Sequence, residues 1–314
     1  MYLRRIPTRH YLSHKRDKSN WLIFILIFFL FLVLIIIFNR LLRTSSLIAP
    51  GNVSGQNEIP IKTPLQKAVE KAMEEAQGTY SIVIKNMKTG ENLEQLENKS
   101  YEPGSLYKLW LMSAVFEKIS LGEIKEGEIL SRDIAFLNKE FNIAPRDAEM
   151  ANGVVTLSVK DALHQMIAIS HNYAALLLLE KLKTSNLKAY IKKISLLNSD
   201  TGTPPRTTPA DTVLFLEKLY KGELVSPEYS KRMMELLKEQ KLNDGLPKYL
   251  PEKAQIAHKT GDIGYFKHDA GIVFADSGDY IIVVFSESKS PGGAQERIAL
   301  LSKAVYEYFT SVKL

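Results

Sequence analysis

The sequence contains no cysteine among its 314 residues. Without thiols the chain can form no disulfide, carries no lipid-modified cysteine and offers no cysteine ligands to zinc. Its six histidines are scattered without the spacing of metal ligands, and no glycine-rich phosphate loop follows a predicted strand. We therefore expect neither a metal ion nor a cofactor.

Outside the N-terminus, basic and acidic residues nearly balance, so the net charge there is small. The chain has 41 Lys and Arg against 35 Asp and Glu, a formal net charge of +6. Residues 1–20 alone hold six basic residues and one acidic residue. A nucleic-acid-binding domain would need a basic face with interleaved aromatic residues in its folded part. We expect no nucleic-acid partner.

The longest apolar run of the chain follows the basic N-terminus. Trp21 to Phe38 are 18 residues without a charge, and Leu41 and Leu42 extend them if Arg40 snorkels. The basic residues before this run predict a cytoplasmic N-terminus and an extracytoplasmic remainder. A cleaved signal peptide is the alternative, but the run is longer than a typical signal core and no Ala-x-Ala-like site directly follows it. We expect a single-pass, uncleaved anchor in the cell membrane.

Composition divides the rest of the chain. The residues after the anchor are rich in Ser, Gly, Asn and Pro without periodicity, as in a tether. Thr63 and Pro64 then form an N-cap followed by proline at the first helical position. The predicted parts are a cytoplasmic tail over 1–20, an anchor over 21–42, a linker over 43–62 and a folded domain over 63–314.

Periodicity within the folded domain predicts its class. After a first helix, strands are expected over 79–85 and from Glu91. Helical patterns dominate from 105 to about 250. Strands return over 254–259, 268–275 and 280–285, and a helix ends the chain. The order predicts an α+β domain: an antiparallel five-stranded sheet flanked by helices, with an inserted all-helical subdomain.

A serine and a lysine stand near the start of the most apolar helical segment. Ser105 and Lys108 are three residues apart, so they share one helix face, and the helix they open is apolar nearly all round. A hydroxyl beside a buried amine suggests an activated nucleophile. The same spacing also occurs at Ser185/Lys188 and Ser286/Lys289, and any one such pair could be an N-cap or a surface pair.

Two further motifs follow in the chain. Ser-x-Asn occurs once, at Ser170 and Asn172, in the junction between two apolar helices, where capping of helix ends is the alternative. Lys-Thr-Gly occurs at 88–90, in a predicted hairpin turn, and again at 259–261. The second copy ends a strand, where burying an inward-facing lysine would cost free energy and therefore suggests a functional role.

Ser-x-x-Lys, Ser-x-Asn and Lys-Thr-Gly, in this order on helix, helix junction and strand, resemble the penicillin-recognising serine acyl-enzymes. Class A β-lactamases are the subgroup that the chain resembles most. The resemblance runs from about Thr63 to the C-terminus and includes 153–157 and 243–247. It implies the β-lactamase/DD-peptidase fold. It also selects Ser105, because Ser185 and Ser286 have no following partners that fit.

The resemblance implies chemical roles for four side chains. Ser105 would attack a carbonyl carbon and become acylated, with Lys108 accepting its proton. Burial and a second cation, Lys259, should lower the pKa of Lys108 so that part of it is neutral. Ser170 would pass a proton to the leaving nitrogen.

Four further residues are implied to contact the substrate. Asn172 would bind its side-chain amide, and Thr260, with the lysine before it, would bind its carboxylate. Gly261 would let the substrate lie close against the strand. The N–H of Asp262 and that of the nucleophilic serine would form an oxyanion hole, in which one donor is typically worth about 3 kcal/mol.

Two positions depart from the family pattern. His171 stands where the family usually has aspartate, and we interpret it as a tolerated change. The family also carries a loop glutamate that activates the deacylating water, whereas residues 196–206 contain no glutamate. Their one acid, Asp200, is interpreted as turn chemistry. The sequence therefore supports acylation but not fast hydrolysis of the acyl-enzyme.

Three functions follow as hypotheses. The leading one is opening of the β-lactam amide through an acyl-enzyme on Ser105. A penicillin-binding DD-peptidase, acting on D-Ala-D-Ala-like cell-wall peptides, is the enzymatic alternative. A sensor or binding module that β-lactams acylate, with little turnover, is the alternative from another class.

Overall fold

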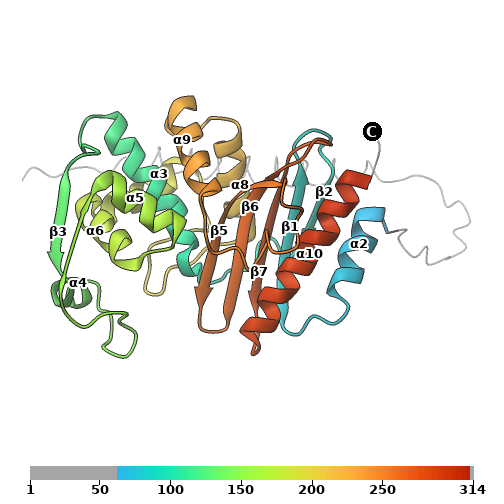
Figure 1. Ribbon diagram of the computed structural model, residues 1–314, viewed down its shortest axis with the longest axis horizontal. Helices are drawn as coiled ribbons and strands as arrows, with labels where there is room; N and C mark the ends of the chain where they lie inside the picture. Colours follow the sequence, from blue (N-terminus) through green and yellow to red (C-terminus); the bar gives the residue numbers. More distant parts are fainter. Residues whose placement is uncertain (1–61, 312–314) are drawn as a thin grey trace, which may run out of the picture. The chain divides into compact units, whose positions relative to one another are not determined.

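Residues 62–311 are described by the computed structural model, and Figure 1 shows their arrangement. A five-stranded sheet lies between two groups of helices. The predicted tail, the anchor over 21–42 and nearly all of the linker lie outside the described residues. Within the described part, no helix combines the length and apolar character needed to cross a membrane.

The predicted five-stranded antiparallel sheet is confirmed. Its strands are hydrogen-bonded in the order β2-β1-β7-β6-β5, and every neighbouring pair is antiparallel. Seven of the eight residues of β7 are buried, because helices cover both faces of the central strands. The strands are β1 (Thr79–Asn86), β2 (Asn92–Gln95), β5 (Gln255–Ile263), β6 (Phe266–Phe274) and β7 (Tyr280–Glu287).

Two helices from opposite ends of the domain cover one face of the sheet. α2 (Pro64–Met73) and α10 (Pro291–Ser311) lie side by side in Figure 1. The N-cap expected at Thr63 is confirmed, since its side chain accepts a hydrogen bond from Gln66 N. Arg297 of α10 donates to the carbonyl of Ala72 at 2.7 Å and ties the two helices together.

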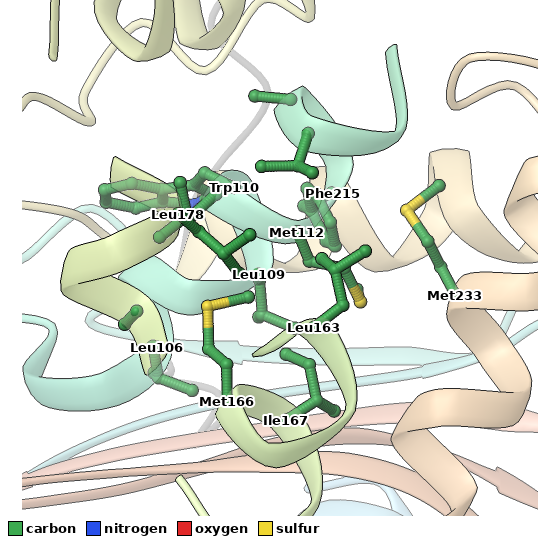
Figure 2. Packing of buried hydrophobic residues seen from close by; sticks show 14 of the residues in the cluster. Leu106, Leu109, Trp110, Met112, Leu163, Met166, Ile167, Leu178, Phe215 and Met233 are labelled. Carbon is green, nitrogen blue, oxygen red and sulfur yellow. The ribbon is translucent and has the colours of Figure 1, made fainter. Parts of the chain in front are cut away.

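The larger core lies on the other face and extends through the helices between β2 and β5. α3 is its central helix, buried continuously from Lys108 to Phe116, as its apolar pattern predicts. Figure 2 shows side chains of α3 packed against Leu163, Met166 and Ile167. The helices are α3 (Tyr107–Ser120), α4 (Ile134–Glu140), α5 (Val159–Ala168), α6 (Asn172–Leu182), α7 (Thr184–Lys193), α8 (Pro209–Tyr220) and α9 (Pro227–Lys238).

Short polar residues begin the helices where the sequence predicts. The side chains of Ser158, Thr208 and Ser226 each accept a hydrogen bond from the backbone N–H three residues later. These bonds satisfy amide donors that the first helical turn leaves without partners. The three helix starts are therefore determined by local chemistry.

The inserted subdomain is not all-helical, and this part of the prediction was wrong. β3 (Ile129–Asp133) and β4 (Val154–Ser158) pair as a two-stranded antiparallel sheet. β3 is largely exposed and β4 is partly exposed, so neither strand shows the strong apolar alternation that reveals a strand. They are also separated by α4 and a loop, which hides their pairing from any local pattern.

Candidate active site

Ser105 lies in a tight turn that leads into the central helix. Gly104–Leu106 form a 3-10 turn, and α3 begins directly after it at Tyr107. The sequence predicted that Ser105 opens the α-helix itself, and the structure shifts it to this preceding turn. Its side chain is half-buried, and Ser105 Oγ makes no hydrogen bond to any residue within 62–311. The hydroxyl is therefore free to meet a ligand.

Lys108 is fully buried and faces the junction between α5 and α6. Its Nζ donates to the carbonyl oxygen of Ser170 at 2.6 Å, to Ser170 Oγ at 3.1 Å and to Asn172 Oδ1 at 2.6 Å. These three acceptors match the three donors of an ammonium group. The structure thus places the Ser-x-Asn motif against the Ser-x-x-Lys motif, with the amine of Lys108 bonded to Ser170 and Asn172.

The third motif converges on the same hydroxyl. Lys259 is fully buried in β5, and its Nζ donates to Ser170 Oγ at 3.1 Å and to the carbonyl of Thr260 at 3.0 Å. Ser170 Oγ accepts from two buried amines, so its own proton is left for another partner. Ser170 also has a φ of 57°, a left-handed conformation that is costly for a residue with a Cβ.

Burial changes the ionisation of both amines, and the charge of Lys259 adds to the effect on Lys108. Desolvation, followed by the charge of Lys259, lowers the pKa of Lys108 to about 7. Desolvation also lowers the pKa of Lys259 to about 8, although the carboxylate of Asp269 opposes this shift. At neutral pH a substantial fraction of Lys108 is therefore a neutral base, while Lys259 remains mostly charged.

Two glycines explain how β5 comes so near the serine turn. Gly104 has a φ of 50°, and a Cβ built there would lie 2.7 Å from the backbone N of Asp262. A Cβ on Gly261 would lie 2.4 Å from the carbonyl oxygen of Pro103 and 2.9 Å from Leu106. Gly261 was expected to make room for substrate. The structure shows that its lack of a side chain also lets the serine turn approach β5, and contact with substrate stays a prediction.

His171 has a structural task at the junction. Its Nδ1 accepts a hydrogen bond from Ala174 N at 3.1 Å, which makes it the N-cap of α6. Capping was the alternative explanation for Ser170 and Asn172. Because the histidine between them supplies the cap, both neighbours can point to Lys108.

The competing copies of the motifs lie elsewhere. Ser286 is buried in β7, where its hydroxyl donates to the carbonyl of Lys267 at 2.5 Å. Ser185 lies in the first turn of α7. The Lys-Thr-Gly at 88–90 is a turn, in which Asn86 Oδ1 accepts from Lys88 N and Thr89 N at 2.9 Å each. The expectation that the first Lys-Thr-Gly is turn chemistry is confirmed.

The loop over 196–206 also agrees with its prediction. Asp200 Oδ1 accepts from Gly202 N at 2.8 Å, a local turn interaction. The loop is fixed by Asp211, whose Oδ2 accepts from Asn198 N at 2.8 Å and from Ser199 Oγ at 2.7 Å. The acid in this loop is thus engaged in shaping the turn.

Sequence reasoning missed two supports behind the site. His268 Nδ1 accepts from Ser286 N at 3.1 Å, so Nε2 carries the proton and donates to the carbonyl of Glu102 at 2.9 Å. Burial lowers the pKa of His268 to about 4, which keeps this tautomer neutral. His258 pairs with Asp269 at 2.9 Å behind β5, and Asp269 also accepts from Leu246 N. The bond from His268 to Glu102 joins residues 166 positions apart, and Asp269 links β6 to β5 and to Leu246, so no local motif reveals either support.

A carboxylate was missed as well. Asn172 Nδ2 donates to Glu149 Oε1 at 2.6 Å, from the loop between α4 and β4. No motif surrounds Glu149, and only the folded loop brings it to Asn172. Within residues 62–311 no cluster of metal-ligating side chains occurs.

A serine turn opposite two buried lysines, on an antiparallel sheet with a helical insert, defines the class of penicillin-recognising serine acyl-enzymes. The model of the β-lactamase enzyme family matches residues 64–309, most of the chain. The chain belongs to this family, and is a serine hydrolase of the β-lactamase type.

Solved structures share the fold. A β-lactamase from Sphaerobacter thermophilus is 21% identical with a TM-score of 0.69, covering 80% of this chain and 98% of its own. The protein PBP-A is 24% identical with a TM-score of 0.69, covering 79% and 96%. The TLA-1 extended-spectrum β-lactamase is 23% identical with a TM-score of 0.66, covering 78% and 97%. No curated protein matches the chain.

Proposed function

We propose that the protein opens the β-lactam amide through an acyl-enzyme on Ser105. The observation that carries this proposal is the hydroxyl of Ser170, which accepts from the buried amines of both Lys108 and Lys259. Burying two amines beside one hydroxyl costs free energy, so this arrangement favours a functional over a structural explanation. We infer that the two amines form a proton path that serves Ser105, which precedes Lys108 by three residues.

Acylation then follows from the ionisation states. Neutral Lys108 takes the proton of Ser105 as Oγ attacks the lactam carbonyl carbon. The oxyanion receives hydrogen bonds from the N–H groups of Ser105 and Asp262, which the close approach of Gly104 to β5 brings near each other. The lactam C–N bond breaks, and the nitrogen takes a proton from Ser170, which the lysines resupply.

Substrate contacts are proposed for the same residues that the motifs single out. Lys259, charged below about pH 8, and Thr260 would bind the carboxylate of the lactam. Asn172 lies exposed beside Lys108 and would bind the side-chain amide of the substrate. The two cations make the site suited to an anionic ligand. This fits the solved PBP-A variant that is described as an acyl-enzyme complex with penicillin G.

The first test is the mass of the intact protein against time after addition of penicillin. We expect an adduct of one penicillin that Ser105→Ala abolishes, because alanine has no nucleophile. Ser185→Ala is the matched control, since it removes the serine of another Ser-x-x-Lys pair. An adduct that survives in Ser105→Ala would contradict the proposal.

The same experiment separates the alternatives. Fast loss of the adduct with nitrocefin turnover supports a β-lactamase. A permanent adduct favours a peptidase or a sensor, and release of D-alanine from a D-Ala-D-Ala peptide then identifies the peptidase. The loop over 196–206, which has no glutamate, is the observation that keeps these alternatives in the test.

A further inference from the structure

The carboxylate of Glu149 is connected to the site through Asn172, although no sequence motif includes Glu149. The amide of Asn172 joins two opposite charges: Oδ1 accepts from Lys108 Nζ at 2.6 Å, and Nδ2 donates to Glu149 Oε1 at 2.6 Å. Glu149 is therefore two hydrogen bonds away from the amine of Lys108. Its charge raises the pKa of Lys108, against the larger effects of burial and Lys259.

The loop that carries Glu149 is fixed in place at the next residue. Met150 N donates to Tyr173 Oη at 3.1 Å, and the carbonyl of Met150 lies 2.8 Å from the same hydroxyl and accepts from Asn138 Nδ2 at 2.8 Å. Tyr173 is 2% exposed and directly follows Asn172 in α6. The loop is thus bonded to the same helix start that presents Asn172.

Glu149 itself remains open to solvent. Its side chain is exposed, whereas the side chains of Lys108 and Lys259 are fully buried. An exposed carboxylate next to Asn172 can accept a hydrogen bond from a solvent water molecule and orient that water toward the site. The acid of the 196–206 loop cannot do the same freely, because Asp200 Oδ1 is engaged by Gly202 N.

We propose that Glu149 is the general base that activates water to hydrolyse the acyl-enzyme. This inference rests on the proposed acylation of Ser105. The carboxylate accepts one proton from water as the water oxygen forms a bond to the ester carbonyl carbon. The bond from that carbon to Ser105 Oγ then breaks, and Oγ takes back one proton, supplied through Lys108. One water is consumed, and the product is a free carboxylic acid.

The decisive variant is Glu149→Gln. Its side-chain oxygen can still accept from Asn172 Nδ2, but it cannot take a proton from water. We expect acylation to stay close to the wild-type rate while loss of the penicillin adduct slows by about 100-fold or more. Rapid mixing followed by intact-protein mass spectrometry measures both steps. Asp147→Asn is the matched control, because Asp147 is exposed in the same loop and its one ion pair within residues 62–311 is with Arg146, at 3.6 Å.

A second variant separates chemistry from positioning. Glu149→Ala leaves space where the carboxylate stood, so added formate should restore hydrolysis of the adduct if a base is what is missing. A purely structural role would not respond to formate.

Each outcome bears on the inference. Wild-type hydrolysis in Glu149→Gln would overturn it, and so would equal slowing of acylation and hydrolysis, or a wild-type adduct that never leaves. These results differ from failure of the proposed function itself, in which the wild-type protein forms no adduct on Ser105.

Discussion

At the scale of single residues, the proposed chemistry depends on the hydroxyl of Ser170, a residue with an unusual backbone conformation. Ser170 accepts from Lys108 and Lys259 while its φ of 57° costs energy that a glycine would not incur. Strained residues persist where the surrounding structure requires them, and they are common at active sites. The backbone conformation that places Ser170 Oγ between both amines is therefore also the strained one.

Ser170→Gly separates the strain from the hydroxyl. Glycine adopts the same φ easily, which removes the backbone strain, but both buried amines lose their shared acceptor, so we expect these two effects on stability to oppose each other. We expect acylation to slow by about 100-fold or more, as for loss of a general acid, measured by stopped-flow with nitrocefin. Acylation at the wild-type rate would exclude Ser170 from the proton path.

The two lysines predict a narrow pH optimum for acylation. Neutral Lys108 increases as the pH rises through about 7, so acylation should accelerate there. Charged Lys259 decreases as the pH rises through about 8, so binding of the substrate carboxylate should weaken. We expect a bell-shaped profile of kcat/KM with its maximum between these values, measured on an anionic β-lactam. A profile that is flat from pH 6 to 9 would contradict both assignments.

At the scale of elements, the site exists because the serine turn and β5 touch without side chains between them. Gly104 of the turn approaches Asp262 N, and Gly261 of β5 approaches the carbonyl of Pro103. The neutral His268 supports the turn from β6 by donating to Glu102. Three elements thus define the position of one hydroxyl.

Gly261→Ala should separate the turn from β5. The added Cβ would lie 2.4 Å from a carbonyl oxygen, which cannot move without displacing the turn. We expect a loss of about 1–3 kcal/mol in the free energy of unfolding together with a strong loss of acylation. Urea unfolding and adduct formation measure the two. Gly127→Ala is the control, because a Cβ there meets nothing within 4 Å and should leave both unchanged.

The elements also show what sequence could and could not reveal. The starts of α5, α8 and α9 were predictable because Ser158, Thr208 and Ser226 reach only three residues along the chain. The β3–β4 pair was not, since its strands are exposed and far apart in sequence.

The same distinction applies to the site. Its Ser105, Ser170 and Lys259 were identified by three motifs in order. Glu149 and His268 were missed because each reaches the site only through a tertiary contact. Local patterns encode the residues of the proposed proton path, and only the folded chain brings the surrounding groups to it.

At the scale of the whole molecule, residues 62–311 contain their own sheet, helices and two hydrophobic cores. The predicted anchor over 21–42 is a separate proposal about where this domain works. We expect the full chain to sediment with membranes and to need detergent for release. A chain that begins at Thr63 should stay in solution and acylate at the same rate.

Fractionation of cells followed by immunoblotting measures this prediction. Protease added to intact spheroplasts should digest the domain, because the basic N-terminus predicts an extracytoplasmic remainder. A protein recovered from the medium without residues 21–42 would instead show that the segment is a cleaved signal.

The convergence on Ser170 has a consequence for how folding of this protein can be followed. Its hydroxyl meets Lys108 from 62 residues earlier in the chain and Lys259 from 89 residues later. Contacts between such distant residues form only when most of the chain has reached its final topology. The proposed acylation of Ser105 by a chromogenic β-lactam would therefore report only fully folded molecules, and its amplitude during refolding would measure the docking of β5.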